Sequence, residues 1–493
     1  MKKIVLSLIV FTMTATSTFA GGILTNTNQS VLFLKNPARD AAIGLDGVYS
    51  NPAGVAFLSD GFHVAFNWQY VHQTRTVTST NPSFALGKKN NGESVKEFEG
   101  VATAPIVPSL QAAYNKDNWS IQLNLSIPSG GGACEFADGL GSFESVVGNI
   151  GYMLLPLGAQ GYDMDGYMKG RQYYYGIQLG AAYKIYPNLS VYGGLRLLYG
   201  DATYKAKISN IQVKTEGGYV DFADYLQLTN ATITTNLEMV NAGIAQYQAA
   251  GIPVPEDLLL TQAKLESTKG SLNQLQKYAQ GVNLLCNQDG VGIAPIIGVD
   301  YKYKNFNFAA KYEFKTQIRM KNESTVNEAS EIAAVNKFRD GEEVNEDVPA
   351  LLTVGAMWSP VEDIRINLGY HHYFDKDASW YNNAQKLLDH DSNEYLAGVE
   401  WDLSDKLTIS AGGQVTRYGL TDDYMNDMSF VTNSYSFGLG FNYKASDKIT
   451  LKAAYFQTNY DDYNRNDYPP LSGMSDSFTR TNRVLGLGVQ VDF

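Results

Sequence analysis

From residue 61 to the C-terminus, the chain consists of short segments in which every second residue is apolar. The clearest lies at 435–443, where aromatic residues and leucine alternate with serine, glycine and asparagine. Residues 119–127 and 306–315 follow the same two-residue period. Successive side chains of a β-strand point to opposite faces, so each segment predicts a strand with one apolar and one polar face. The sequence therefore predicts an all-β fold.

The connections between these segments are short and long in strict alternation. The short ones are turns such as Lys304-Asn305 and Ser404-Asp405, and the long ones are 78–104, 128–170, 205–288, 321–347, 375–392, 419–432 and 461–481. We predict fourteen strands, at 61–77, 105–115, 119–127, 171–185, 189–204, 289–303, 306–320, 348–358, 364–374, 393–403, 406–418, 433–444, 449–460 and 482–493. An even strand number with tiny turns at one end and long loops at the other is typical of an antiparallel transmembrane β-barrel.

A soluble β-sandwich would show the same alternation with its apolar faces turned inward. The strict alternation of short and long connections favours the barrel, and so do the aromatic residues and the composition. Aromatic residues gather towards the ends of the apolar faces, as at Trp68 and Tyr70, and membrane interfaces enrich such residues. Tyrosine and glycine are abundant, with 33 and 46 copies in 493 residues. The mean hydropathy of -0.22 does not oppose a barrel, because a barrel spreads its apolar residues over alternate positions.

Both ends of the chain carry signals. Residues 1–20 combine Lys2 and Lys3, a short apolar run and small residues before Gly21, which predicts a cleaved secretory signal peptide; a retained anchor is the alternative. At the other end, Phe493 closes an apolar strand face, which resembles the signal read by the barrel-assembly machinery. We therefore expect a protein of the bacterial outer membrane, in contact with lipid and lipopolysaccharide.

Residues 21–60 lie between the signal peptide and the first strand, and they lack strand alternation. Their prolines and glycines favour tight turns that keep a segment compact without regular structure. We predict an N-terminal hatch that plugs the lumen of a barrel at 61–493; a periplasmic tail is the alternative. The net charge of -12 and the pI near 5.0 argue against nucleic acid as a partner.

The stretch GLDGVYSNPAGVAF, which begins at Gly44, resembles the FadL family of outer-membrane long-chain fatty-acid transporters, which includes aromatic-hydrocarbon channels of the TodX type. The resemblance implies a signal peptide, a hatch with an Asn-Pro-Ala motif and a fourteen-stranded barrel. The motif corresponds to Asn51, Pro52 and Ala53, and we interpret the copy at 36–38 as incidental. In architecture the resemblance covers the whole chain, but only the hatch segment and the C-terminal strand are motif-like.

The family also implies a path, from an external groove between helical loops, through a lumen pocket, to a sideways exit beside a kinked third strand. The candidates for this lateral gate are Pro128, Gly130, Gly131 and Gly132, because proline and glycine weaken a strand ladder. Without the resemblance they indicate an ordinary loop. Loop 205–288 predicts two amphipathic helices, at 234–250 and from Pro255 onward, and 327–339 predicts a third. Their apolar stripes form a docking groove or pack the loops together.

A fatty-acid carboxylate needs a cation, and arginine binds it through two parallel hydrogen bonds. Our candidates on polar strand faces are Arg196, Lys311 and Arg365, although no family motif matches them. The candidates for an alkyl tunnel are the inward apolar residues Leu198, Ile296, Met357, Leu396 and Phe456. Burial of each methylene contributes about 0.8 kcal/mol, so the tail would supply most of the affinity.

Cys134 and Cys286 both fall in predicted external loops, and we expect a disulfide between them because the envelope is oxidising; two free thiols are the alternative. His371 and His372 are adjacent on one strand and face opposite ways, so they predict no metal site. No HExxH, CxxC or GxSxG pattern occurs, and we predict neither a cofactor nor catalysis.

Together these features favour passive, hatch-gated uptake of a hydrophobic or amphiphilic small molecule by a monomer, with a long-chain fatty acid as the favoured ligand. Aromatic hydrocarbons and bile-type or haem-like amphiphiles stay open as ligands. Two other classes of protein also stay open. One is a porin for polar solutes, and the other is a non-transporting adhesin or phage receptor built on the long loops.

Overall fold

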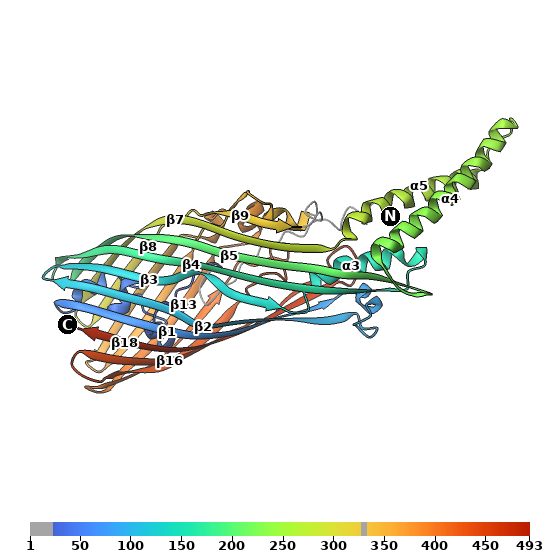
Figure 1. Ribbon diagram of the computed structural model, residues 1–493. Helices are drawn as coiled ribbons and strands as arrows, with labels where there is room; N and C mark the ends of the chain where they lie inside the picture. The colour runs from blue at the N-terminus through green and yellow to red at the C-terminus, as the bar shows by residue number, and fades with distance from the viewer. Residues whose placement is uncertain (1–22, 327–332) are drawn as a thin grey trace.

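The computed structural model describes residues 23–326 and 333–493. The predicted signal peptide at 1–20 lies outside the described residues, as does the first part of the helix predicted at 327–339. The described chain forms a long β-barrel that carries helices at one end (Figure 1).

Fourteen antiparallel strand positions form the wall in the described residues. They are β1 (Gly61–Thr80), β2 (Val95–Lys116), β3 (Trp119–Phe136), β4 (Gly161–Tyr186), β5 (Leu189–Thr215), β7 (Val282–Tyr303), β8 (Phe306–Glu313) with β9 (Arg319–Val326), β11 (Leu351–Val361), β12 (Ile364–Tyr373), β13 (Ser392–Ser404), β14 (Leu407–Arg417), β15 (Ser434–Lys444), β16 (Ile449–Tyr460) and β18 (Ser475–Asp492). β8 and β9 share one position, because both pair with β7. The pairing of β1 with β18 closes the barrel. The predicted fourteen-stranded barrel is confirmed.

The apolar faces of the strands point outward. On β15 the alternate residues Tyr435, Phe437, Leu439, Phe441 and Tyr443 are between 42% and 54% exposed, whereas the serines at 434 and 436 are buried. Large exposed apolar side chains occupy outward positions on the other long strands as well. A closed barrel with such an outer face requires lipid around it. The soluble sandwich, with its apolar faces inward, is therefore excluded.

Several strands run further than predicted. β4 and β5 have 26 and 27 residues, whereas the predicted segments were 171–185 and 189–204. Beyond about residue 200 the apolar residues of β5 change face: Lys205 and Lys207 point outward, while Tyr204 and Ala206 are buried inside. The outer face meets water there and the inner face packs against loops. This change of face interrupts the alternation while the hydrogen-bond ladder continues.

The long connections carry helices at one end of the barrel. α4 (Phe222–Ala249) and α5 (Glu256–Leu275) form an antiparallel hairpin that projects far from the wall (Figure 1), and they confirm the two helices predicted in loop 205–288. α3 (Gly141–Leu154) was not predicted, because its glycines weaken the helical signal. Its Phe143, Val147 and Ile150 belong to a large buried cluster with β4 and β5. No helix in the described ranges is long and apolar enough to cross a membrane.

Short elements complete the loops. They are β6 (Gly218–Asp221), β10 (Glu343–Asn345), β17 (Tyr463–Asn466), η4 (Pro82–Leu86), η5 (Leu155–Leu157), η6 (Gln276–Tyr278), η8 (Ala333–Phe338), η9 (Asp375–Asp377) and η10 (Tyr381–Leu387). The 3-10 helix η8 lies within the third predicted helix at 327–339.

Residues 23–60, which we call the plug, lie inside the barrel, and nearly all of them are buried. The plug contains α2 (Val31–Lys35), η2 (Leu45–Val48) and η3 (Gly54–Phe57). Ser30 caps α2 by accepting a hydrogen bond from the amide of Leu32. The segment therefore lies in the lumen, as the predicted hatch requires, and not outside the barrel as a periplasmic tail would.

Glycines on six wall strands let the plug lie directly against the wall. A Cβ atom on Gly438 of β15 would stand 1.9 Å from the carbonyl oxygen of Leu34. One on Gly398 of β13 would stand 1.9 Å from Oδ1 of Asn36. Glycines at corresponding positions on the other strands face plug atoms in the same way: Gly355, Gly369, Gly412 and Gly486. The wall from β11 to β18 is therefore shaped to the plug.

Candidate functional site in the plugged lumen

Buried ion pairs attach the first half of the plug to β13 and β14. Lys35 donates to Oγ of Ser410 at 2.7 Å and lies 3.5 Å from Glu400. Arg39 bridges Asp46 of the plug, at 2.7 Å, and Glu400, at 3.1 Å. Removing one partner of a buried pair costs about 3–5 kcal/mol, so this half of the plug is firmly held.

His371 of β12 forms a second attachment. Its ring nitrogens each lie 2.9 Å from a carboxylate, one from Asp40 of the plug and one from Glu394 of β13. A neutral imidazole has a single N–H, so this bridge needs one further proton on the histidine or on a carboxylate. His372 turns to the other face of the strand and contacts Asn393. Among the residues that the structure describes, no cluster of side chains could hold a metal ion.

The Asn-Pro-Ala motif contacts β3, β5 and β7. Asn51 donates to Asp300 at 2.6 Å. The carbonyl oxygen of Pro52 accepts a hydrogen bond from the side chain of Gln122 at 2.7 Å. The carbonyl oxygen of Ala53 accepts one from the hydroxyl of Ser190 at 2.8 Å. The copy at 36–38 also has a structural position, because Asn36 packs against Gly398. Both copies therefore attach the plug to the wall.

The ladder between β2 and β3 is interrupted. The two strands pair from Lys116–Trp119 to Leu110–Leu125, and then again only at Val101–Glu135 and Gly100–Phe136. No pair joins 102–109 to 126–134 in these described strands. β3 stays paired with β4, with register shifts around 126–132. Gly130 and Gly132 have φ angles of 92° and 75°, which favour glycine. The residues predicted for the lateral gate thus lie beside this interruption.

The first residues of the plug take the place of β2 along this part of β3. The amide of Asn26 donates to the carbonyl oxygen of Pro128 at 2.8 Å, and that of Gly130 donates to the carbonyl oxygen of Leu24 at 3.2 Å. The side chain of Asn26 adds a 2.8 Å bond to the carbonyl oxygen of Gly130. A small cavity beside them is lined by Asn26, Asn28, Gln29, Val71, Val107, Ile127 and Tyr173. The start of the plug therefore seals the interruption.

The three cations predicted as carboxylate ligands all have acidic partners within the protein. Arg196 pairs with Glu313, and Lys311 lies 2.6 Å from the same carboxylate. Arg365 lies 2.6 Å from Asp402 and 3.4 Å from Glu400. Arg196 and Arg365 pair with carboxylates on other strands, whereas Lys311 pairs with the residue two positions further along its own strand. The sequence alone does not show which strands lie side by side at these positions. A cation that is already neutralised is a poor site for a ligand carboxylate.

The five predicted tunnel residues do not share one surface. Leu396 and Phe456 pack against Phe33 and Leu34 of the plug. Ile296 packs with Ala53 and Ala56, and Leu198 belongs to the large cluster that includes α3. Met357 is only partly buried. Leu396 and Phe456 are thus the pair that the fold brings together.

The predicted disulfide is wrong, because Cys134 and Cys286 are free, buried thiols. They lie in β3 and β7 rather than in loops. The register runs from Cys134 through Gly170 and Tyr204 to Cys286, which puts three strand spacings between them. At about 4.8 Å per spacing, the Cα atoms lie well beyond the roughly 7 Å that a disulfide tolerates.

Two lumen cations were missed at the sequence level. Arg75 of β1 and Arg480 of β18 are register partners and are 1% and 4% exposed. Arg480 falls in a predicted loop, at 461–481. The signal that could have found the pair is the closure of the barrel, which makes the first and last strands neighbours.

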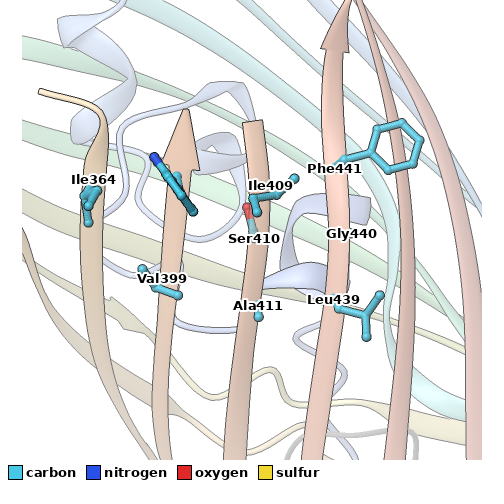
Figure 2. Close-up of a pocket in the computed structure, with 9 residues that line it drawn as sticks. Ile364, Val399, Ile409, Ser410, Ala411, Leu439, Gly440 and Phe441 are labelled. Carbon is cyan, nitrogen blue, oxygen red and sulfur yellow. The ribbon is translucent and has the colours of Figure 1, made fainter. Parts of the chain in front are cut away.

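A groove of about 520 Å³ lies across β12–β15 (Figure 2). Its lining consists mainly of exposed apolar side chains, including Val399, Trp401, Ile409, Leu439 and Phe441. These side chains lie on the outer, lipid-facing side of the wall. The groove therefore belongs to the membrane surface and not to the lumen.

A lipid-facing barrel, a lumen filled by its own N-terminal segment and a broken ladder at the third strand define the plugged β-barrels of the outer membrane. Within that class the chain has the FadL-type fold. It resembles a Pseudomonas aeruginosa FadL homologue with a TM-score of 0.61 at 11% identity, over 96% of this chain and 100% of that one. The P. putida toluene transporter TodX matches with a TM-score of 0.52 at 13% identity, over 91% and 94% of the two chains.

A TodX deltaS2S3 mutant, described as a monoaromatic hydrocarbon channel, matches with a TM-score of 0.57 at 12% identity, over 96% of this chain and 100% of that one. No family model and no curated protein matches the sequence. At these identities the likeness establishes the fold alone.

Proposed function

We propose that this protein is an outer-membrane channel for passive uptake of hydrophobic or amphiphilic small molecules, with long-chain fatty acids as its main ligands. The plug closes the lumen, and the ligand leaves sideways between β2 and β3. The observation that carries this proposal is the interrupted ladder at 102–109 and 126–134, which plug residues 24–29 cover.

The kinds of contact favour the sideways path. Residues 24–29 carry no charge, and they are attached to β1, β2 and β3 by hydrogen bonds between neutral groups, each worth about 0.5–1.5 kcal/mol. Moving the rest of the plug breaks the buried pairs of Lys35, Arg39 and His371, which cost several kcal/mol each. A ligand that stays in lipid also keeps about 0.8 kcal/mol per methylene that it would lose in water. The start of the plug therefore moves, and the remainder stays in place.

Other ligands and functions have weaker support. Solved structures with this fold include a toluene transporter and a monoaromatic hydrocarbon channel, so an uncharged hydrocarbon is the second candidate ligand. A porin for polar solutes is disfavoured, because it needs a water-filled path and the plug occupies the lumen. The projecting α4–α5 hairpin is the feature that favours a surface receptor.

A cross-link across the interruption tests the sideways path. Val107→Cys and Ile127→Cys place two thiols beside one small cavity, in a background where Cys134 and Cys286 are replaced by serine. A short bis-methanethiosulfonate reagent forms a disulfide with each thiol, releases methanesulfinate, and so holds β2 and β3 together by a bridge that a reductant cleaves. We expect uptake of a labelled fatty acid by cells to fall to background, and cleavage of the bridge to restore it.

A matched pair controls for the cross-link itself. Ala112→Cys and Leu123→Cys join positions that already pair across the same two strands. Bridging them should leave uptake unchanged. If the Val107–Ile127 bridge also leaves uptake unchanged, the ligand does not leave between β2 and β3.

A further inference from the structure

Two arginines lie side by side on the inner face of the wall. Arg75 of β1 and Arg480 of β18 are register partners, and both side chains are buried. Neighbouring strands are about 4.8 Å apart, so the two side chains leave the wall next to each other. Like charges in this position repel unless an anion lies between them.

Arg75 has no acidic partner in the described parts of the chain. Its Nε donates to Oε1 of Gln73 at 3.0 Å, and its Nη2 has no hydrogen-bond partner among the described residues. Arg480 donates from Nη1 to the carbonyl oxygen of Phe430 at 3.5 Å and lies over the ring of Tyr460 at 4.8 Å. Arg75 is thus a buried guanidinium with no counter-ion among the described residues, and such a group is costly. Arg196, Lys311 and Arg365, by contrast, all have carboxylates beside them.

Two amides extend the polar site towards the plug. Gln73 and Asn482 are the next inward pair on the same two strands. Nε2 of Gln73 and both polar side-chain atoms of Asn482 are buried and have no partner among the described residues. These groups add unused hydrogen-bond donors next to the arginines.

An apolar surface begins at the next inward pair, Val71 and Val484. These two valines form one buried cluster with Phe33 of the plug and with Leu396 and Phe456 of the wall. Val71 also lines the small cavity beside the β2–β3 interruption. Along two strands the lumen thus presents a cationic pair, then amides, then an apolar surface that reaches the interruption.

We propose that Arg75 and Arg480 bind the anionic head group of an amphiphile, a carboxylate or a phosphate, while its alkyl chain extends past Val71 towards the β2–β3 interruption. Guanidinium groups hold such oxyanions through parallel hydrogen bonds. The pair makes the channel selective for charged amphiphiles over neutral molecules of the same length. This inference rests on the proposed function in one respect, because it takes the lumen as the ligand path.

Binding to the purified full-length protein in non-ionic detergent tests the head-group site. The probes are hexadecanoate, hexadecyl phosphate and hexadecanol, which share one tail. We expect the wild type to bind at least one anion about tenfold more tightly than the alcohol, a difference expected of charge-assisted hydrogen bonds. Arg75→Gln and Arg480→Gln should each remove most of this preference and leave hexadecanol binding unchanged, whereas Arg75→Lys should keep part of it.

Arg319→Gln is the matched control, because that side chain is exposed on β9, far from the pair in the wall order. It should not alter binding of any probe. Heat-modifiable migration in gels verifies that each variant forms its barrel. Tighter binding of hexadecyl phosphate than of hexadecanoate would identify the head group as a phosphate. The reverse order would identify it as a carboxylate. Equal affinity of the wild type for all three probes would overturn the assignment, as would equal loss of alcohol and anion binding in Arg75→Gln.

The two proposals fail in different ways. If the cross-linked β2–β3 variant still takes up fatty acid while the anion preference depends on Arg75, the exit path is wrong and the head-group site stands. If the bridge blocks uptake but Arg75→Gln leaves the anion preference intact, the exit path stands and the head-group site is wrong.

Discussion

Charged side chains in the lumen have two different roles at the scale of the residue. Arg196, Lys311 and Arg365 neutralise carboxylates of the wall, whereas Arg75 has no acidic neighbour among the described residues. The sequence predicts that cations face the lumen, because they alternate with apolar residues. It does not predict which of them are neutralised, since Glu313 lies 117 residues from Arg196.

Arg196→Met tests the structural role of the paired cations. The change leaves Glu313 buried with Lys311 as its remaining cation, so we expect the free energy of unfolding to fall by about 3–5 kcal/mol. Urea unfolding in lipid vesicles, followed by tryptophan fluorescence, measures this. Arg75→Met is the control, and it should not lower stability because no carboxylate loses its partner. Equal losses in both variants would show that the two arginines have the same role.

At the scale of the element, the register of the wall strands places a row of glycines opposite the plug, where a larger side chain would collide with it. Gly438→Val would drive a side chain into the backbone of Leu34, so we expect the plug to shift and the barrel to conduct ions. Current across a planar bilayer measures this, and the wild type should stay closed. Gly193→Val is the control, because a Cβ there meets nothing within 4 Å. A closed Gly438→Val barrel would mean that the wall does not fix the plug.

The α4–α5 hairpin is a separable element. The hairpin joins the barrel through the start of α4 and the end of α5, where Phe222, Leu226 and Leu275 are buried. Most of the remaining length of the hairpin is exposed. Replacing residues 228–271 with a short flexible turn should leave the heat-modifiable migration of the barrel unchanged. Uptake of hexadecanoate should also persist. Uptake at background level would instead make the hairpin part of ligand capture.

The elements differ in how far the sequence predicts them. The lipid-spanning parts of the strands follow from alternation, because lipid and lumen impose opposite preferences on the two faces. The outer parts of β4 and β5 were missed where the apolar side changes face. The disulfide prediction failed because it placed Cys134 and Cys286 in loops, whereas both lie within strands. In the wall, the strands that carry the two cysteines are three strand spacings apart.

At the scale of the whole molecule, the outward apolar side chains determine the solvent that the protein needs. We expect purified protein to aggregate when detergent is removed and to remain dispersed in lipid vesicles, because water would otherwise contact a continuous apolar surface. Light scattering during detergent dialysis, with and without lipid, checks this. Monodisperse protein in plain buffer would contradict the transmembrane assignment.

The central claim is that ligand passes the plug sideways rather than through the periplasmic end. A fatty acid with a photoreactive group at the end of its tail, activated during uptake by cells, records the path on the protein itself. Peptide mapping should find label on Val71, Val107 and Ile127, beside the β2–β3 interruption. Label on Asn115 and Ser190, near the short turns below the plug, would instead contradict the sideways path.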